Sequence, residues 1–365
     1  MQHPARHTAA LRALCALGLH AEVLVPAVLE ALHKVVPSAR NLFDWTDEQG
    51  RLVRYFIEGP IDAVIAQRYF DEFHNRREGE AMPPFQALRR TPAGIRSAGE
   101  LDHAAFYASA LYNEIWQPQG FRYRMEAVLR GARGQLLGSL VLYRGPGEAR
   151  FSAVDERQLA EVTPAFATAL ETCGPAGADD RHVVSPEAPQ TVLMTLDGEV
   201  CHASDGAHRL LLLADGGVTR DRLTRPLDAL GGGALAMLLA RLREPRDALA
   251  PAPSITHENP WGQFVLSGVL LRPAAARNVV LAQVTITRLE PHRVALERAL
   301  RALPVTPGQM AVCRELYRGL PQAEIGGRLG VAPATVVDHA RKAYRALDVR
   351  SAQELRARLD ALIAR

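Results

Sequence analysis

The sequence predicts a multidomain protein in which an α+β region precedes an all-α domain of four helices. The chain has 365 residues, which is too long for one ordinary domain. Several short runs alternate apolar and polar residues between turn residues, as antiparallel strands do. Residues 304–365 instead carry apolar residues at helical spacing, between residues that begin and end helices.

Composition narrows the class of protein. Hydrophobic residues make up 48% and charged residues 23% of the chain, which is typical of globular domains. No apolar run approaches the roughly 20 residues that span a bilayer, so we expect no membrane contact. We find no nucleophile elbow, phosphate-binding glycine loop or zinc pattern, and therefore expect no enzyme, cofactor or metal. The four cysteines match no metal or redox spacing, which favours buried, inert thiols in a reducing cytoplasm. They are Cys15, Cys173, Cys201 and Cys313.

The first block, residues 1–172, is expected to combine helices with two β-hairpins. Its basic start and the run A-L-C-A-L-G-L superficially resemble a secretory signal. Leucines and valines continue at helical spacing well past any cleavage site, so we predict an amphipathic helix or helix pair. The expected hairpins lie at 41–59 and 123–143, the further helices at 61–74 and 102–116, and a long loop at 76–100.

The end of this block carries a family resemblance. The run G-S-L-V-L-Y-R is followed by F-S-A-V-D-E-R-Q-L, where Ser152 and Asp155 resemble a capping box at the start of a helix. With a central antiparallel sheet before it, the block resembles a GAF domain. The resemblance implies helices on one side of that sheet.

The second block, residues 186–290, begins with a strong hairpin signal. Asp197-Gly198 separates two alternating runs, and Asp205 is expected to cap the helix that follows. Two strand-like runs come after the glycine triplet at 231–233. This order resembles a PAS-type domain, although Ser204-Asp205 replaces the usual Asn. The two blocks together form the expected α+β sensory region.

Residues 291–303 are predicted to form a linker helix. Leu296, Leu300 and Leu303 fall at i, i+4 and i+7, on one helical face. This face either packs on the preceding sheet or pairs with its twin in a dimer.

Residues 304–365 hold ten Lys and Arg against six Asp and Glu, whereas the whole chain has a formal net charge of +3. The excess positive charge therefore lies at the C-terminus, as expected if only this part meets phosphate. Thr306 with Gln309 is expected to cap a first helix, and Ser351 with Glu354 a last one. Between them a short helix from Pro321, a turn at 330–332 and a longer helix at 333–347 are predicted.

Four motifs follow one another in this region: T-P-G-Q at 306–309, G-L-P-Q-A-E-I at 319–325, L-G-V-A-P-A-T-V-V-D-H at 329–339 and L-D-V-R-S-A-Q-E-L at 347–355. With them the region resembles the helix-turn-helix domain of LuxR/NarL-type transcription regulators. The resemblance implies a recognition helix in the DNA major groove. Val337 and Ala323 stand where lysine is common, so we expect weaker phosphate attraction and a greater need for dimerisation. Asp348 replaces a glycine but tolerates the left-handed conformation.

The resemblance assigns roles along the recognition helix. Val336, Ala340 and Ala343 are spaced to face the scaffold, whereas Val337, Asp338 and Arg341 would project into the groove. The remaining polar residues would contact phosphates. The candidate DNA-binding residues are Thr335, Val336, Val337, Asp338, His339, Arg341, Lys342 and Arg345.

Aromatic residues are concentrated before residue 172, where 17 of the 21 lie. A cavity for a small apolar or aromatic molecule would need such a set, and an aromatic-rich core is the alternative interpretation. The candidate ligand-binding residues are Phe43, Trp45, Tyr55, Phe106, Tyr107, Trp116 and Tyr123.

From these observations we expect a cytoplasmic, homodimeric transcription regulator that binds double-stranded DNA. A small effector in the first block would shift the arrangement of the 291–303 helix. We expect activation rather than repression, with RNA polymerase as a candidate partner. The alternative is that the first two blocks serve dimerisation or bind a partner protein without a small ligand.

Overall fold

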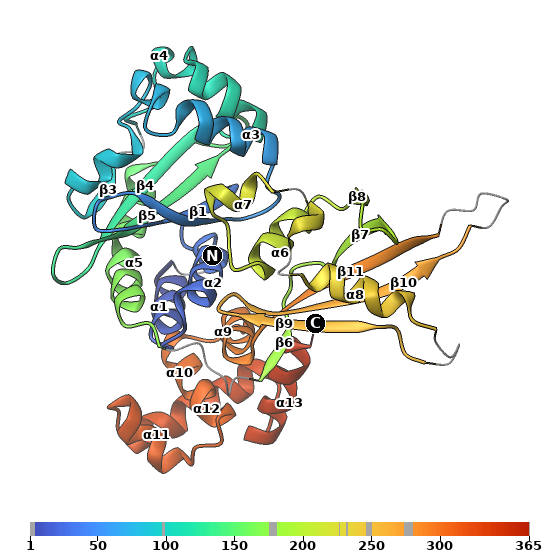
Figure 1. Cartoon of the computed structure of the whole chain (residues 1–365). Helices are drawn as coiled ribbons and strands as arrows, with labels where there is room; N and C mark the ends of the chain where they lie inside the picture. The colour runs from blue at the N-terminus through green and yellow to red at the C-terminus, as the bar shows by residue number, and fades with distance from the viewer. Residues whose placement is uncertain are drawn as a thin grey trace.

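The computed structural model describes residues 4–96, 99–174, 181–225, 227–230, 233–245, 250–273 and 280–364. Two antiparallel sheets with helices are followed by a C-terminal helical region (Figure 1). The C-terminal helices lie below both sheets in this view, next to the first two helices of the chain.

The first sheet has the strand order β2-β1-β5-β4-β3. Both predicted hairpins are confirmed, since β1 pairs with β2 and β4 with β5. The short strand β3 lies inside the predicted loop at 76–100 and pairs with β4. The strands are β1 (Arg40–Thr46), β2 (Leu52–Ile57), β3 (Gly94–Arg96), β4 (Tyr123–Arg130) and β5 (Leu136–Arg144).

One face of this sheet packs on α2 (Ala21–Leu32) and α5 (Ala153–Glu171), and α1 (Pro4–Cys15) packs against these two helices. The predicted N-terminal helix pair is therefore confirmed. Phe43 of β1 reaches α5, where its ring lies 5.4 Å from that of Phe166. The capping box of Ser152 and Asp155 at the start of α5 is also confirmed.

Shorter helical segments cover the other face, whereas helices on one side alone were expected. The predicted helices at 61–74 and 102–116 are each interrupted. In the second, the Ser109 hydroxyl accepts the N–H of Tyr112 at 3.2 Å and competes with the regular helical bonds. The segments are α3 (Ala63–Arg68), α4 (Ala104–Tyr107), π-turns at Tyr69–Phe73 and Tyr112–Trp116, and 3-10 turns at Arg77–Glu80, Phe85–Arg90 and Gln117–Gln119.

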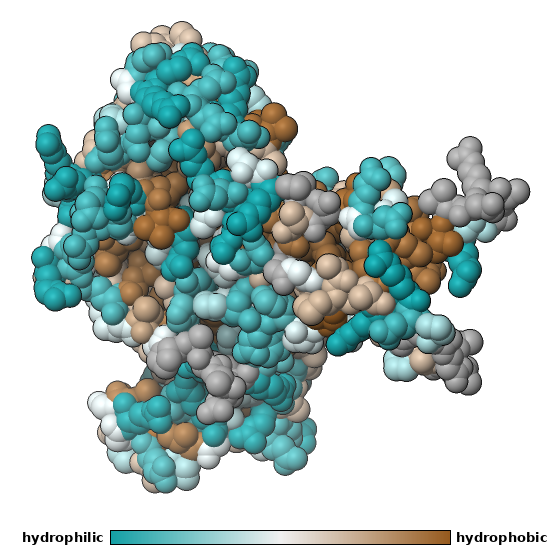
Figure 2. Space-filling view, viewed as in Figure 1, coloured by the Kyte–Doolittle hydropathy of each residue, from teal (hydrophilic) through white to brown (hydrophobic). Residues whose placement is uncertain are grey.

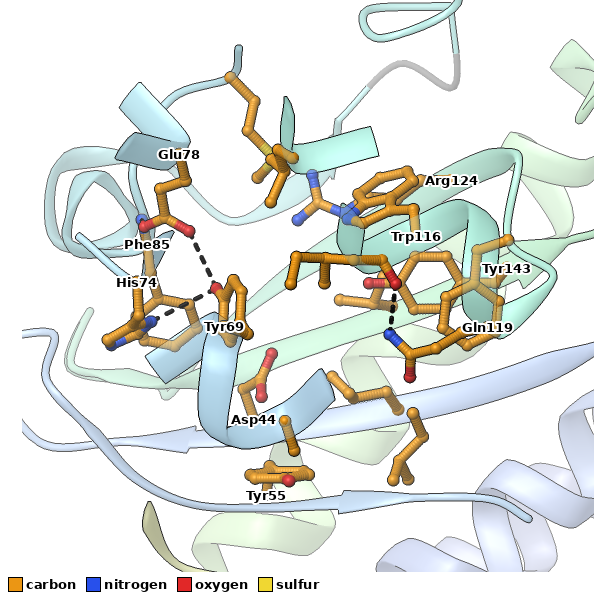
Figure 3. A pocket seen from close by; sticks show the side chains of 18 of the residues that line it. Asp44, Tyr55, Tyr69, His74, Glu78, Phe85, Trp116, Gln119, Arg124 and Tyr143 are labelled. Carbon is orange, nitrogen blue, oxygen red and sulfur yellow. Dashed lines mark hydrogen bonds between the residues drawn. The ribbon is translucent and has the colours of Figure 1, made fainter. Parts of the chain in front are cut away.

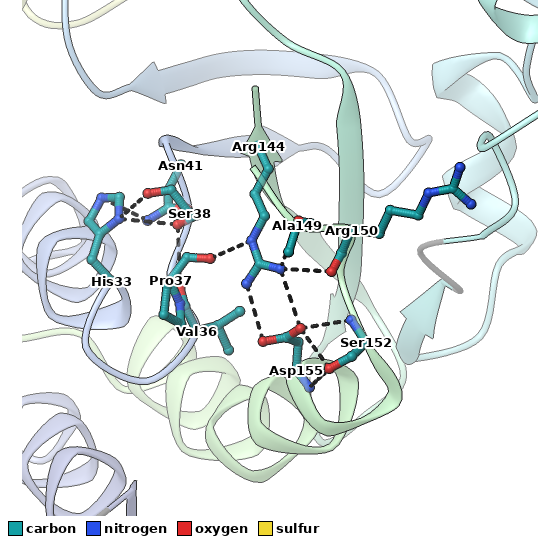
Figure 4. A network of polar contacts seen from close by, with 10 residues as sticks. All are labelled: His33, Val36, Pro37, Ser38, Asn41, Arg144, Ala149, Arg150, Ser152 and Asp155. Atoms are coloured by element: carbon teal, nitrogen blue, oxygen red, sulfur yellow. Dashed lines mark hydrogen bonds and ion pairs between the residues drawn. The ribbon is translucent and has the colours of Figure 1, made fainter. Parts of the chain in front are cut away.

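A polar network fixes the connections at one end of the inner strands β1 and β5 (Figure 4). Arg144, at the end of β5, donates to the Pro37 carbonyl at 2.8 Å and pairs with Asp155 at 3.2 Å. Nearby, the Ser38 hydroxyl donates to Asn41 at 2.8 Å. One buried guanidinium thus joins the α2–β1 connection to the first turn of α5, which holds helix and sheet in register.

The second sheet has the order β8-β7-β11-β10-β9, with β6 also paired to β11. The hairpin at Asp197-Gly198 is confirmed, whereas the predicted Asp205 cap is wrong. Gly206 occupies the N-cap without a side-chain bond, and Gln190 accepts its N–H at 3.1 Å. The strands are β6 (His182–Val184), β7 (Gln190–Thr195), β8 (Val200–Ala203), β9 (Ser254–Asn259), β10 (Gly262–Leu271) and β11 (Leu281–Pro291).

Helices α6 (Ala207–Ala214) and α8 (Ala234–Arg243) pack on this sheet. Strand β9 and helix α8 were not expected from the sequence. Two short elements, α7 (Arg220–Leu223) and a 3-10 turn at Leu227–Ala229, precede α8. Of the glycine triplet, Gly231 and Gly232 lie outside the described residues.

The two sheets share an aromatic core at Trp261, which is almost completely buried. Trp45 meets its ring edge-on and Phe56 stacks on it, both at 5.8 Å between ring centroids. Gly217 approaches the same indole with a φ of +110°, and a Cβ added there would lie 2.7 Å from Trp261 Nε1. A glycine is therefore required at this contact.

The C-terminal region consists of α9 (His292–Ala302), α10 (Pro307–Tyr317), α11 (Gln322–Leu329), α12 (Pro333–Leu347) and α13 (Ala352–Ile363). The predicted capping box at Thr306 and the Ser351 cap are confirmed. Asp348 has a φ of +52°, so it adopts the left-handed conformation expected of it.

The leucine face of α9 packs differently from both expectations. Leu296, Leu300 and Leu303 are buried in one cluster with α10, α12, α13 and Ala10 of α1. Because the chain itself covers this face, these leucines neither lie on the preceding sheet nor pair with a second copy.

Candidate functional site

Helix α12 presents one buried stripe and one exposed stripe. Val336, Ala340 and Ala343 are buried in the core with α10 and α11, which holds the helix against its scaffold. On the other side Val337 is 51% exposed, and the side chains of Arg341 and Lys342 are 69% and 57% exposed. Arg345 is exposed and Thr335 is half-buried.

Two of the eight candidate DNA-binding residues are placed differently from the others. Val336 is fully buried, so it holds the helix in place and offers no side-chain contact to DNA. The half-buried His339 ring packs over the start of α10, where a Cβ on Gly308 would lie 2.5 Å from its Cε1 atom. Thr335, Val337, Asp338, Arg341, Lys342 and Arg345 remain on accessible surface.

Asp338 is paired within the helix. Its carboxylate accepts from Arg341 Nη2 at 3.0 Å and from Lys342 Nζ at 2.7 Å. Hydrogen bonds from Lys342 and Arg341 lower the pKa of Asp338 below its usual value. Such exposed pairs exchange readily with other partners, so both cations remain available to phosphate or base oxygens.

A shallow hollow of about 340 Å³ runs along the exposed stripe. Its wall includes Arg341 and Arg345, and it adds Gln322, Tyr344 and Arg350 to the residues expected from the sequence. Arg350 follows the bend after Asp348, and the run of arginines at 341, 345 and 350 is the sequence signal that could have found it.

A second candidate site is a cavity of about 140 Å³ between the first sheet and the helical segments over it (Figure 3). Alternate residues of the strands form its floor, including Asp44, Glu126 and Tyr143. Tyr69 and Trp116 from the π-turns are part of its cover.

Two of the seven candidate ligand-binding residues, Tyr55 and Trp116, line this cavity. Phe43 and Trp45 lie on the same strand as Asp44, but successive side chains of a strand point to opposite faces. Phe43 and Trp45 therefore contact Phe166 and Trp261 on the face of the sheet opposite the cavity.

The other three candidates lie away from the cavity. Phe106 is buried against Trp116, 4.9 Å between centroids, so it supports the wall from behind. Tyr107 donates to Asp102 at 2.7 Å, and Tyr123 is half-buried near Arg150. These five residues are core or surface aromatics, as the alternative interpretation allowed for single residues.

The cavity contains ionisable groups that the sequence analysis did not single out. Glu126 accepts from Arg124 at 2.8 Å and from Arg96 at 2.9 Å. Glu78 accepts the Tyr69 hydroxyl at 2.9 Å and the N–H of Asn75 at 2.6 Å.

Of these groups, the carboxyl of Asp44 has the weakest hydrogen bonding. Within the described parts of the chain, the Ser139 hydroxyl is the one hydrogen-bond donor to its carboxyl, at 3.3 Å. Burial, with the nearby charge of Glu126, raises the pKa of Asp44 to about 8. The cavity therefore holds one carboxyl group that lacks a strong partner.

The cysteines are divided between core and surface. Burial raises the pKa of the Cys15 thiol to about 12 and that of Cys313 to about 11. Cys173 and Cys201 are exposed, so the expectation of buried thiols is wrong for these two. Among the described residues, no cluster of three or more His, Cys, Asp or Glu could hold a metal ion. Nor does the described part of the chain include a helix with the length and apolar character needed to cross a membrane.

No protein-family model matches the chain, and no curated protein does. Among solved structures it is similar to the E. coli DhaR(N)-DhaL complex, with a TM-score of 0.25 and 14% identity over 77% of this chain and 87% of that one. The phage VqmA-DPO complex follows, with a TM-score of 0.18 and 16% identity over 48% and 84%. The sensor region of a sensor histidine kinase has a TM-score of 0.18 and 16% identity over 45% and 63%. Similarity this weak carries no argument about function.

Proposed function

We propose that this protein is a transcription regulator that binds double-stranded DNA through a LuxR/NarL-type helix-turn-helix domain at residues 304–365. The observation that carries the proposal is the division of α12 into two stripes. Val336 and Ala340 fix the helix on its scaffold, while Arg341 and Arg345 are exposed on the opposite side. A rigid helix with a basic exposed face suits insertion into the major groove.

The residues of α12 have distinct proposed roles. Arg341 is placed to read guanine, since a guanidinium donates to two acceptors of that base in the major groove. Lys342, Arg345 and Thr335 fix the register on phosphates. Arg350, beside the same hollow, adds a further phosphate contact.

The test is selection of DNA sequences from a random library, followed by gel-shift titration of the selected operator. Arg341→Ala should relax the selected sequence at one base position, at a cost of about 1–3 kcal/mol for the preferred base. Lys342→Ala should weaken binding to all DNA sequences equally. It should also reduce the salt dependence of binding by the amount expected for about one lost phosphate contact. The matched control is Arg358→Ala, which removes an equal charge from the exposed surface of α13. Selectivity that survives Arg341→Ala would remove this residue from base recognition.

The preceding GAF-like and PAS-like blocks are proposed to control this domain. A small effector in the cavity of the first block would alter the position of α9, and thereby the spacing of two recognition helices in a homodimer. We propose a cytoplasmic activator that contacts RNA polymerase and has no enzymatic activity. Native mass spectrometry of the purified full chain tests the homodimer and the bound effector together. A monomer mass, or no bound small molecule under any condition, contradicts this scheme.

A second candidate function is protein binding by the first two blocks without a small ligand. It is favoured by hydrophobic surface along the arm formed by α8, β10 and β11 (Figure 2). Met237, Val269 and Leu271 are exposed there. Replacing Val269 and Leu271 by Ser would dissociate a dimer held by this arm, and unchanged mass would exclude the arm from dimerisation.

A further inference from the structure

We propose that the cavity on the first sheet binds a small organic ammonium ion, with Asp44 as its counter-ion and the aromatic side chains around it as its walls. This inference rests on the proposed effector site and names the chemistry of its ligand. It also distinguishes Asp44, which would touch the ligand, from the other carboxyl groups of the cavity, which have partners within the protein.

Asp44 is positioned to contact a ligand in this cavity. It lies in the middle of β1, between Leu42 and Tyr55 on the cavity floor, and its carboxyl points into the space below Tyr69 (Figure 3). Among the described residues, the one donor to this carboxyl is the Ser139 hydroxyl on the neighbouring strand, at the long distance of 3.3 Å. Asp44 is half-buried, and a polar group partly withdrawn from water is costly without partners, so this carboxyl favours a donor that arrives with the ligand.

The charges of the interior favour a cation. Three carboxyl groups line the inner cavity, Asp44, Glu78 and Glu126, against the two guanidinium groups of Arg96 and Arg124. Both guanidinium groups are already bound to Glu126, whose side chain is 2% exposed. An anionic ligand would have to displace Glu126 from both arginines and would lie beside the carboxylate of Glu78, whereas an ammonium ion balances the charge that Asp44 gains when it ionises.

The remaining ionisable groups of the cavity do not change this balance. Arg40 donates to the carbonyls of Glu58 and Pro60, each at 2.6 Å, and Asp62 caps α3. These two opposite charges offset each other. Burial lowers the pKa of His74, so its ring is neutral at neutral pH.

Aromatic side chains surround the space that the carboxyl faces. Tyr55 and Tyr69 lie on either side of Asp44, and Trp116 and Tyr143 stand across the cavity (Figure 3). A cation within about 6 Å of such rings is attracted by their electron-rich faces, most strongly when water is excluded. The volume of about 140 Å³ is close to that of an engineered cavity of roughly 150 Å³ that holds benzene. The ligand is therefore no larger than a small substituted ring or a short branched chain.

The protonation of Asp44 gives the proposal a distinctive signature. The groups that face it are Glu126 and Arg124 on β4, Glu78 in the cover, Ser139 on β5 and the tyrosines Tyr55, Tyr69 and Tyr143. With the pKa near 8, the empty cavity holds a protonated carboxyl at neutral pH. An ammonium ion favours the carboxylate, so its binding below pH 8 releases one proton. Affinity should then rise up to about tenfold per pH unit until the pKa is reached.

The experiment compares three probes of matched shape on the full chain: benzylamine, benzyl alcohol and benzoate. Isothermal titration at pH 6.5, 7.5 and 8.5, in two buffers of different ionisation enthalpy, measures both affinity and proton release. Isopentylamine and tetramethylammonium extend the cationic series to aliphatic shapes. We expect at least one of the ammonium ions to bind at least tenfold tighter than benzyl alcohol and benzoate, with close to one proton released at pH 6.5.

Asp44→Asn should abolish the preference for the ammonium ion, whereas Asp47→Asn should retain it, since Asp47 lies in the turn of the same hairpin and binds Arg51. Proton release by the unaltered protein keeps the test independent of how well the Asp44 variant folds. Benzoate as the tightest ligand, no binding by any ammonium ion, or ammonium binding without proton release would overturn the proposal. The titration needs no DNA, so its failure is separate from that of operator binding, which is measured without amine.

Discussion

The ion pair between Glu297 and Arg314 joins the linker helix α9 to the first helix of the proposed DNA-binding domain. The Glu297 side chain is 1% exposed and that of Arg314 is 11% exposed. Arg314 Nη2 donates to Glu297 Oε2 at 2.8 Å, with a second bond from Nε. Burial lowers the pKa of Arg314, but the hydrogen bond and charge of Glu297 outweigh it and leave the pKa above its usual value.

We predict that Glu297→Ala destabilises the C-terminal region by about 3 kcal/mol. Removing one partner of a buried pair costs about 3–5 kcal/mol, because the remaining charge stays buried without compensation. The lower end applies here since Glu315 lies near Arg314 and part of the guanidinium reaches solvent. Urea unfolding measures the loss, and hydrogen exchange of the α10 amides locates it.

A double-mutant cycle tests the reasoning. If the two side chains act as a pair, Glu297→Ala and Arg314→Ala together cost about as much as either alone, which gives a coupling of roughly 2–3 kcal/mol. Glu324→Ala, an exposed carboxylate on α11, is the control and should stay within about 0.5 kcal/mol. Additive losses in the double variant would refute the assignment of the pair as the joint between α9 and α10.

Two further predictions concern the sheets. Gly217→Ala should cost about 3 kcal/mol in thermal or urea unfolding, because the strain of a positive φ and the clash with Trp261 add. Gly216→Ala is its control, since it has a similar positive φ but its Cβ would meet the end of the Arg222 side chain instead of an indole. Equal losses in the two variants would contradict the role of the indole. Asp44→Asn should stabilise the empty protein more at pH 9 than at pH 5, by about 4 kcal/mol at roughly 1.4 kcal/mol for each pH unit between 5 and the folded pKa. The folded carboxyl stays protonated up to about pH 8 while the unfolded one ionises near its ordinary pKa, so native stability falls as pH rises through this window. A difference between variant and unaltered protein that is the same at both pH values would contradict the raised pKa.

The local signals of the C-terminal region could be predicted because each acts within a few residues. Thr306 with Gln309 and Ser351 with Glu354 satisfy free N–H groups of the next turn, so their spacing alone indicates a helix start. The left-handed Asp348 is likewise a single-residue property. The hairpin turn at Asp197-Gly198 belongs to the same class.

The cavity could not be predicted in the same way. Strand alternation places Phe43 and Asp44 on opposite faces, but it does not say which face remains open, since that depends on segments distant in the chain. The aromatic residues therefore drew attention to the packed face, and the polar Asp44 on the open face was missed. The cover was also not predicted, because one expected helix changes to a π-turn at Tyr69 and the other is interrupted where the Ser109 hydroxyl accepts a backbone N–H.

Helix α1 connects the two cores, and this arrangement supports the proposed control of α9. Its Leu11 and Leu14 belong to the core of the sheets, whereas Ala10 belongs to the cluster of the C-terminal helices. Arg6 of the same helix donates to the Arg301 carbonyl at 2.7 Å and also to that of Leu303. A ligand in the cavity would touch one face of β1 and β5, while the opposite face packs on α5, which in turn contacts α1. One sheet thickness and two helices, α5 and α1, therefore separate the cavity from the end of α9. Close-packed interiors transmit small displacements of side chains and backbone over such contacts. Coupling requires an element that both sites bias, and the double-mutant cycle measures how strongly Glu297 of α9 is held to Arg314 of the first helix of the C-terminal domain.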